Sequence, residues 1–250
     1  MAASRSHTSL PTLVESVMKF GLTSHFPCSY LPDREERLLV HVGEAQEGMV
    51  YDKLIQAGFR RSGEQMYRPH CARCNECKAI RINIAKYTPS RSQKRLINKN
   101  KDLNMLWRAS EEINLTDYFP LYADYISERH RDGSMFPPDL NSFLTFNQCA
   151  WRQPYFLEAW LDNRLVAVAI TDKMANGLSA FYTFFAPDLD KRSLGGYMIL
   201  AQINQALQLE LPYLYLGYYI NQCDKMNYKT QYSGYEWFNG EYWSDESLAR

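Results

Sequence analysis

The sequence contains no long apolar run. No stretch approaches the roughly 20 apolar residues that span a bilayer, and the first twenty residues, MAASRSHTSLPTLVESVMKF, lack the uninterrupted apolar core of a signal peptide. Both absences argue against export and against a membrane partner. We therefore expect a cytoplasmic protein, in which cysteines are thiols or metal ligands more often than disulfides.

The chain also has no net charge, since 28 Lys and Arg balance 28 Asp and Glu. The basic residues are nevertheless unevenly placed: between residues 68 and 108, eleven Lys and Arg face only Glu76 and Asp102. Such a segment suits a polyanion, whose counterions are released when basic side chains replace them. The alternative is a solvated helix face, which accounts for many charge runs.

No Ser-His-Asp or Cys-His pattern, internal repeat or low-complexity tract is present. The 250 residues are 46% hydrophobic and 14% aromatic, with 18 tyrosines, which is typical of a folded globular protein of one or two domains. The chain is therefore long enough for a catalytic fold, but it shows no pattern for covalent catalysis by a hydroxyl or a thiol.

Apolar periodicity predicts the elements of the chain. In the first half, YDKLIQAGFRRSG is typical of a helix that stops at Gly58, MYRP and IRINI of short strands, and TDYFPLYADYISERH of a helix capped by Thr116. PPDLNSFLTFNQCA indicates another helix. In the second half, YFLEAWL and LVAVAITDK form a predicted hairpin, followed by the strand GLSAFYTFFAP, the helix SLGGYMILAQINQALQLEL and the buried strand LPYLYLGYYI.

The order strand, strand, strand, helix, strand resembles the GCN5-related acyltransferase fold. In that fold a Gly-bearing turn before a helix directs backbone N–H groups toward an acyl donor. Gly195 and Gly196 stand at the corresponding place here. We assign them to donor positioning through the backbone.

Three separated segments carry a more specific resemblance: YDKLIQAGFRRSGEQMYRP, YTPSRSQKR and YLYLGYYINQCDKMNYKTQY. Together they resemble the arginyl-tRNA–protein transferase family, most closely its bacterial aspartate/glutamate leucyltransferase branch. The resemblance implies transfer of leucine from leucyl-tRNA to the N-terminal amine of proteins that begin with Asp or Glu, which marks them for N-degron proteolysis. It implies aminoacyl-tRNA and such acceptor proteins as partners.

The residues suit that reaction independently. An α-amine with a reference pKa near 7.7 to 8.0 is partly neutral at cellular pH, so it needs positioning more than activation. We therefore assign no side-chain general base; Asp172 and Tyr182 are the candidates that stand nearest to such a role. An acidic acceptor side chain requires a fixed cation, and a guanidinium binds a carboxylate through two hydrogen bonds. Arg60 and Arg61 are the predicted acceptor ligands, with Arg81 a weaker candidate.

Two cationic sets are predicted to bind tRNA. Arg91, Lys94, Arg95 and Lys99 recur at helical spacing behind Pro89 and Ser90, which can open a helix. The second set, in CDKMNYK, consists of Lys225, Lys229 and Tyr228, and the aromatic rings of Tyr218, Tyr219 and Tyr228 could stack on unpaired bases.

The cysteines form a C-x2-C-x2-C run at Cys71, Cys74 and Cys77. Cys28 or His70 could complete a tetrahedral zinc site. An iron–sulfur cluster is the other alternative, although the Cys-Pro pair that ends a ferredoxin run is missing. The remaining alternative is that the cysteines are plain thiols in a loop-rich lobe. The reaction itself requires no cofactor.

We therefore predict an α+β enzyme with a small N-terminal, Cys-containing recognition lobe at residues 1–100 and a GCN5-related acyltransferase-like domain at residues 101–250. Two other readings keep part of this picture. One changes the donor to arginyl-tRNA, and the other is a non-catalytic, zinc-dependent RNA-binding module. A small-molecule acetyltransferase is a third alternative.

Overall fold

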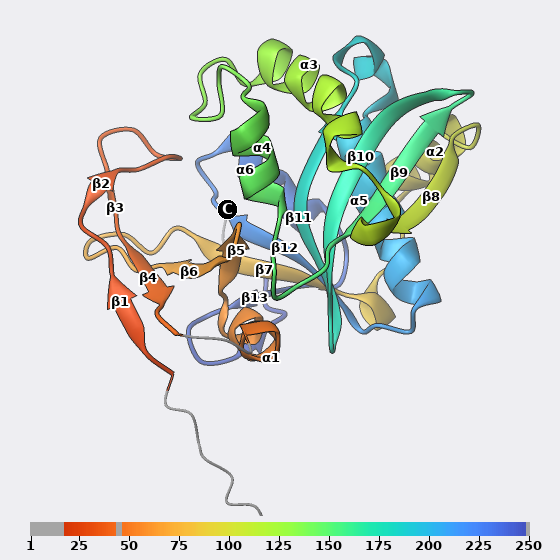
Figure 1. Ribbon diagram of the computed structural model, residues 1–250. Coiled ribbons are helices and arrows are strands. Elements are labelled where there is room, and N and C mark those ends of the chain that lie inside the picture. The colour runs from red at the N-terminus through yellow and green to blue at the C-terminus, as the bar shows by residue number, and fades with distance from the viewer. Residues whose placement is uncertain (1–17, 44–46, 249–250) are drawn as a thin grey trace, which may run out of the picture.

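A mixed sheet of eight strands forms the centre of the computed structural model, which describes residues 18–43 and 47–248 (Figure 1). Only β11 and β12 are parallel neighbours; the other adjacent pairs are antiparallel. Across the sheet the order is β14 (Trp243–Ser244), β13 (Tyr235–Phe238), β7 (Lys78–Asn83), β12 (Tyr213–Tyr219), β11 (Gly177–Phe185), β10 (Arg164–Met174), β9 (Tyr155–Leu161) and β8 (Asn104–Ala109).

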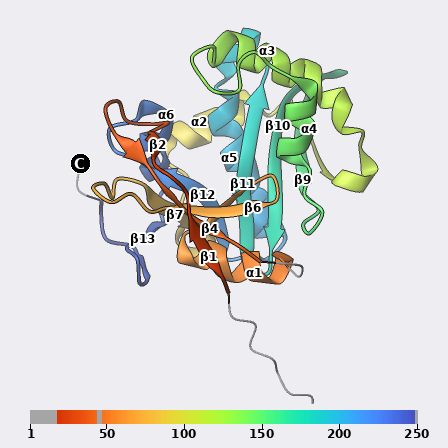
Figure 2. The same ribbon diagram turned by 60° about the vertical axis from the view of Figure 1, so that its left-hand side comes forward.

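Helices cover both faces of this sheet (Figure 1, Figure 2). They are α2 (Arg91–Lys99) and α5 (Leu194–Gln208) on one face, and α3 (Phe119–Arg129) and α4 (Leu140–Asn147) on the other. Strand β10 shows why: Ala167 and Ala169 pack toward α5, whereas Val168 and Ile170 pack toward α3 and α4. The sequence of a strand that is buried on both faces is a continuous apolar run, such as LVAVAI in β10.

A second sheet of four strands lies beside the first. Its order is β1 (Phe20–Leu22), β4 (Leu38–His41), β6 (Gln65–Pro69) and β5 (Arg60–Ser62), all antiparallel. A short pair, β2 (Phe26–Pro27) and β3 (Glu35–Glu36), stands apart from it. Helix α1 (Glu47–Leu54) packs beneath the junction of the two sheets, and α6 (Asp224–Asn227) follows β12.

The structure confirms the α+β class and the strand, strand, strand, helix, strand order of the second half, as β9, β10, β11, α5 and β12. The hairpin between β9 and β10 turns at Asp162, which has a positive φ of 52°. No helix within residues 18–43 and 47–248 is long and apolar enough to cross a bilayer.

Gly58 ends the first helical segment as predicted: it adopts φ +80° after a 3-10 turn at residues 55–57, and strand β5 follows it. The predicted cap at Thr116 is wrong. The cap near residue 116 is Asn114, whose side chain accepts a hydrogen bond from the Thr116 amide at 3.3 Å; a 3-10 turn at residues 115–118 then precedes α3. Asn and Thr are both favoured cap residues, so the sequence pattern does not distinguish Asn114 from Thr116.

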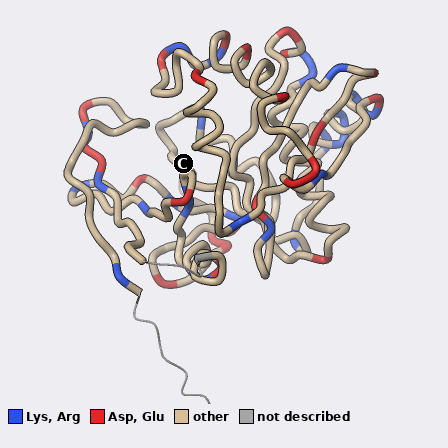
Figure 3. The backbone as a smooth tube through the Cα atoms, viewed as in Figure 1, with Lys and Arg blue, Asp and Glu red and all other residues tan. Residues whose placement is uncertain are grey.

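The division at residue 100 stays a prediction, and residues 1–17 lie outside the described ranges. The described chain already enters the large sheet at β7 and its helical layer at α2. Charged residues of both signs are spread over the whole fold (Figure 3).

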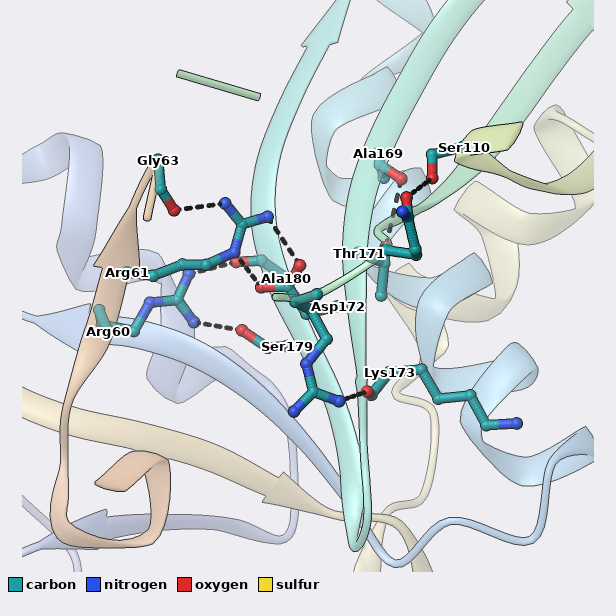
Figure 4. Close-up of polar contacts among 12 residues, drawn as sticks. Arg60, Arg61, Gly63, Ser110, Ala169, Thr171, Asp172, Lys173, Ser179 and Ala180 are labelled. Atoms are coloured by element: carbon teal, nitrogen blue, oxygen red, sulfur yellow. Dashed lines mark hydrogen bonds and ion pairs between the residues drawn. The ribbon is translucent and has the colours of Figure 1, made fainter. Parts of the chain in front are cut away.

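A buried ion pair connects the two sheets. Arg61 of β5 donates from Nε and Nη2 to the two carboxylate oxygens of Asp172 of β10, each at 2.7 Å (Figure 4). Both side chains are fully buried. The Arg61 guanidinium also lies 3.8 Å from the centroid of the Phe181 ring and donates to the Gly63 carbonyl at 3.0 Å.

Breaking this pair should destabilise the fold strongly. We expect Asp172→Asn to lower the free energy of unfolding in urea by about 3 to 5 kcal/mol, because a buried guanidinium loses its counter-charge. The control is Asp188→Asn: Asp188 binds Arg164 through the same two-bond geometry at 2.7 Å, but both side chains are 55% exposed. That change should cost about 1 kcal/mol or less. Equal losses would contradict the special role of the buried pair.

Candidate active site

A cavity opens where β11 and β12 separate. The two strands pair only between Gly177–Ser179 and Tyr213–Tyr215, whereas β12 pairs with β7 along its whole length. Residues 180–183 of β11 and 216–218 of β12 line the resulting cavity of about 750 Å³. Separated parallel strands expose backbone and side chains toward the gap, so the topology itself produces a binding site.

Helix α5 begins at this cavity. Gly195 and Gly196 line it, and the cap residue Ser193 has a left-handed φ of 51° and no side-chain cap bond. The first amide groups of the helix therefore lack capping side chains, and the helix dipole places positive potential there. A Cβ at Gly195 would lie 3.0 Å from Cε1 of Phe185, so a glycine allows that ring to pack against the helix start. The role of Gly195 and Gly196 in donor positioning stays a prediction.

Arg60 reaches into the same cavity from β5. Its Nη1 donates to Oγ of Ser179 at 2.9 Å, and its Nη2 donates to the Ala180 carbonyl at 2.6 Å (Figure 4). Arg60 is only 8% exposed, and within the described part of the chain no carboxylate pairs with it. Gly217, at φ +80°, lies against it: a Cβ there would be 3.4 Å from Nε of Arg60. Arg60 is thus a fixed, buried cation with donors to spare.

Arg61 and Asp172 are placed differently from Arg60. Each satisfies the other in the ion pair described above, so neither is free to bind a substrate carboxylate or to accept a proton. Arg81, the weaker candidate, is likewise occupied: it pairs with Glu236 at 2.8 Å and stacks 3.6 Å from the centroid of the Tyr213 ring. Of the three predicted arginines, Arg60 alone presents an uncommitted charge to the cavity.

Lys229 lies inside the cavity wall and not on the surface. It is 5% exposed, and its Nζ donates to the Tyr218 carbonyl and contacts Sδ of Met226 at 3.1 Å. Burial, followed by the nearby charge of Arg60, lowers the pKa of Lys229 to about 7. The sequence pattern could not distinguish this buried lysine from a surface one.

Among the described residues, no Asp or Glu lines the cavity. Its charged members are all cations: Arg60, Arg61, Arg129, Lys225 and Lys229. One wing is aromatic and apolar and includes Tyr125, Met135, Phe146, Phe181, Tyr182, Phe185 and Ile199. The Tyr182 hydroxyl contacts Sδ of Met135 at 3.4 Å, and burial raises its pKa, so it stays protonated. The cavity is suited to apolar groups and to anions.

The predicted tRNA-binding helix forms as expected and lies next to the cavity. Ser90 caps α2 through a capping box with Gln93, and Arg91, Lys94, Arg95 and Lys99 are exposed. Leu96 of the same helix packs against the start of α5, where a Cβ at Gly196 would lie 3.4 Å from its Cδ2. Lys99 donates to the Lys191 carbonyl in the loop before α5. An exposed basic surface therefore borders the glycine-lined end of the cavity.

The second predicted set is divided. Lys225 is exposed at the rim and pairs with Asp132 at 3.1 Å, and Tyr228 is 39% exposed. Tyr218 and Tyr219 are buried: Tyr218 donates to the Gly58 carbonyl at 3.0 Å, and Tyr219 bonds to Oδ1 of Asn221. Tyr218 lines the cavity but is held by the chain. Only Tyr228 offers an exposed ring for stacking.

The four predicted cysteines gather near Tyr30 and Tyr67, which line the cavity. Burial raises the pKa of Cys77 to about 12, and neighbouring Cys71, Cys28 and Cys74 add to the shift. Within the described residues, however, no three His, Cys, Asp or Glu side chains converge to hold a metal ion. The thiols are close enough to influence one another but do not form a ligand set. Metal binding here stays a prediction.

Sequence reasoning missed three groups at the cavity: Tyr30, Tyr67 and Ser179. Tyr30 and Tyr67 line the wall beside Arg60, and Ser179 holds the guanidinium. No local pattern separates them from the other tyrosines and serines of the chain. Their role follows only from the contact between strand β5 and the large sheet.

Profiles of a known family match both halves of the chain. "Arginine-tRNA-protein transferase, N terminus" matches residues 26–95, and "Arginine-tRNA-protein transferase, C terminus" matches residues 117–239. The aspartate/glutamate leucyltransferase of Pseudoalteromonas atlantica is 44% identical over 226 residues, covering 90% of this chain and 96% of that protein. The one of Pseudomonas fluorescens Pf-5 is 46% identical over 227 residues, with the same coverage.

These matches, with the acyltransferase-like order of the second half, define the class as amino-acid transferases that use aminoacyl-tRNA. Within that class the chain belongs to the aspartate/glutamate leucyltransferase family. Among solved structures, L-PGS from Bacillus licheniformis aligns with a TM-score of 0.42 and 10% identity, covering 70% of this chain and 50% of that one. A likeness at that level carries no inference about this chain.

The burial of Lys229 should make the melting temperature of the protein depend on pH. Because its pKa is about 7 in the folded state and 10.5 in the unfolded chain, the unfolded state binds more protons between these values. The wild-type melting temperature should therefore rise relative to that of Lys229→Met as the pH increases from 7 to 10, with no relative change below pH 6. Calorimetric melting across pH 5.5 to 10 measures this, with Lys173→Met, at an exposed site, as control. Parallel curves for wild type and Lys229→Met would contradict the low pKa.

Proposed function

We propose that this protein transfers leucine from leucyl-tRNA to the α-amine of proteins that begin with Asp or Glu. The observation that carries the proposal is the cavity between β11 and β12, which combines an apolar wing, buried cations and no carboxylate. The names of the relatives support the same reaction. The product would carry an N-terminal leucine, a destabilising residue for N-degron proteolysis.

The composition of the cavity favours leucine over arginine as the donor side chain. An arginine pocket would need a carboxylate to balance the guanidinium, since a buried cation without a partner is costly. The wing around Phe146, Phe181 and Phe185 offers apolar contact instead. A leucyl side chain gains favourable burial there, and an arginyl group would meet further cations.

Arg60 is the proposed ligand for the acidic side chain of the acceptor. Ser179 and Ala180 fix its guanidinium, so little conformational entropy is lost when a carboxylate binds. Arg61 would act indirectly, since its bond to Asp172 anchors strand β5 and with it the neighbouring Arg60. Of the two predicted acceptor residues, Arg60 would thus bind the carboxylate and Arg61 would position Arg60.

The proposed reaction needs no covalent enzyme intermediate. The neutral α-amine attacks the ester carbonyl carbon, the carbonyl oxygen becomes an oxyanion, and the ribose oxygen then leaves with a proton as the amide forms. Amide groups at the start of α5, around Gly195 and Gly196, would stabilise the oxyanion. The remaining acceleration comes from holding the two substrates together. No step involves electron transfer, so none requires a redox cofactor.

A transfer assay distinguishes the donors and the acceptors. Single-turnover reactions with radiolabelled leucyl-tRNA or arginyl-tRNA, and peptides that begin with Asp, Glu, Lys or Ala, should show transfer of leucine to the Asp and Glu peptides alone. Transfer of arginine at a comparable rate would contradict the donor assignment. RNA binding without transfer from either donor would favour the non-catalytic alternative.

The basic helix α2 is the proposed tRNA contact, because its exposed lysine and arginine side chains lie beside the cavity. Replacing Lys94 and Arg95 together by Ala should weaken leucyl-tRNA binding and reduce the slope of log K against log salt by about 2, one unit for each lost phosphate contact. The control replaces Lys53 of α1 and Lys173 of β10, both exposed, and should leave the slope unchanged. Filter binding from 50 to 300 mM salt measures both, and an unchanged slope for the Lys94/Arg95 variant would remove α2 from the interface.

A further inference from the structure

Two buried cations contact neighbouring residues of β12. Arg60 packs against Gly217, and Lys229 donates to the carbonyl of the next residue, Tyr218. Both line the cavity, both are more than nine-tenths buried, and each is close enough that Arg60 lowers the pKa of Lys229. At these residues β12 no longer pairs with β11, so the two charges face the cavity.

Neither cation has a carboxylate partner within the described residues. The other buried arginines of the chain do: Arg61 pairs with Asp172, and Arg81 pairs with Glu236. Lysine and arginine are rarely buried without such a partner, and two like charges close together raise the cost further. Neutral carbonyls and a hydroxyl hold Arg60 and Lys229 in position but do not balance their charge.

This arrangement is that of an anion site. The Ser179 hydroxyl and the Ala180 carbonyl occupy two of the five N–H groups of Arg60, and Lys229 also keeps a donor beyond its bonds to Tyr218 and Met226. An anion bound between the cations would remove their mutual repulsion and satisfy these donors. The hydroxyl groups of Tyr30 and Tyr67 border the same wall.

The depth of the pair favours a carboxylate on a short side chain. A phosphodiester would have to bring nucleosides on both sides of it into contact with residues that are at most 8% exposed. The carboxylate of an N-terminal Asp or Glu stands at the end of one or two methylene groups and can enter alone. The basic surface of α2 offers exposed contacts for phosphates without such burial.

We propose that Lys229 is the second specificity-determining cation of the acceptor site, binding the side-chain carboxylate of the N-terminal Asp or Glu together with Arg60. This rests on the proposed function, and it moves Lys229 from the predicted tRNA contacts to the acceptor pocket. A single arginine can bind asparagine or glutamine through its carbonyl oxygen. Two buried cations instead require a full negative charge, which predicts discrimination against the amides.

The test compares Lys229→Met, Lys229→Arg and the control Lys173→Met with wild type. At saturating leucyl-tRNA, Lys229→Met should raise the KM for a peptide beginning with Asp by about 10-fold to 100-fold, the loss of one charge-assisted hydrogen bond of about 1.5 to 3 kcal/mol. Lys229→Arg should recover part of the loss. The Kd for leucyl-tRNA and its salt dependence should equal those of wild type in all variants.

Weaker leucyl-tRNA binding with a shallower salt dependence, at an unchanged peptide KM, would overturn the proposal and assign Lys229 to a phosphate. The wild-type reaction separates this from the proposed function: if wild type transfers leucine and Lys229→Met does so with an unchanged KM, only the role of Lys229 fails. If wild type transfers nothing, the proposed function fails.

A measurement on the unaltered protein covers the case in which Lys229→Met does not fold. Cyanate adds to neutral amines, and peptide mass spectrometry after brief treatment at pH 8 gives the fraction of Lys229 that is carbamoylated. A dipeptide that begins with Asp should reduce this fraction several-fold, while one that begins with Asn should not, and Lys173 should react equally in both. Equal protection by both dipeptides, or by neither, would contradict a carboxylate between Arg60 and Lys229.

Discussion

The ion pair between Arg61 and Asp172 is the contact on which the site depends. It joins strand β5 of the small sheet to strand β10 of the large one, with both side chains fully buried. Arg60 is the preceding residue of β5, so the pair also determines where that cation stands relative to Ser179 and Ala180. A charge pair of this kind is a poor source of net stability but a strong constraint on geometry, because either partner alone is costly to bury.

The separation of β11 from β12 creates the cavity at which the Arg61–Asp172 ion pair positions Arg60. One wall comes from β11, β12 and α5, which lie in the C-terminal match, and another comes from β5 and β6, which lie in the N-terminal match. A two-substrate transferase needs such a junction, since the donor and the acceptor must meet at one carbonyl. The apolar wing, the glycine-lined helix start and the two unbalanced cations divide one cavity into regions of different chemistry.

Charge distribution decides the character of the site although the chain is neutral overall. Carboxylates balance Arg61 and Arg81, while Arg60 and Lys229 in the cavity wall have no carboxylate partner among the described residues. In the proposed acceptor site, the folded protein carries the cost of this arrangement and an anionic substrate would recover it on binding. The lowered pKa of Lys229 is the measurable sign of that cost.

Much of the fold followed from local pattern. The alternation and the apolar runs of residues 155–219 predicted β9 to β12 and α5 in order, and Ser90 with the basic spacing predicted α2, because these features depend on residues two to four positions apart. Strand β5 was missed for the opposite reason: GFRRSG is extended only because it pairs with β6 and docks on β10. The cap at Asn114 is local, but Asn and Thr are both suitable cap residues.

The sequence by itself determined the family, the order of the elements, the Gly pair at α5 and the identity of Arg60 as a candidate. Only the tertiary structure decided that Arg60 is free while Arg61 is occupied, and that Lys229 is buried beside Arg60 although 169 positions separate them in the chain. Local patterns encode which faces of an element are apolar. The counter-charge of a buried group is a long-range contact, and it exists only once the strands have been brought together.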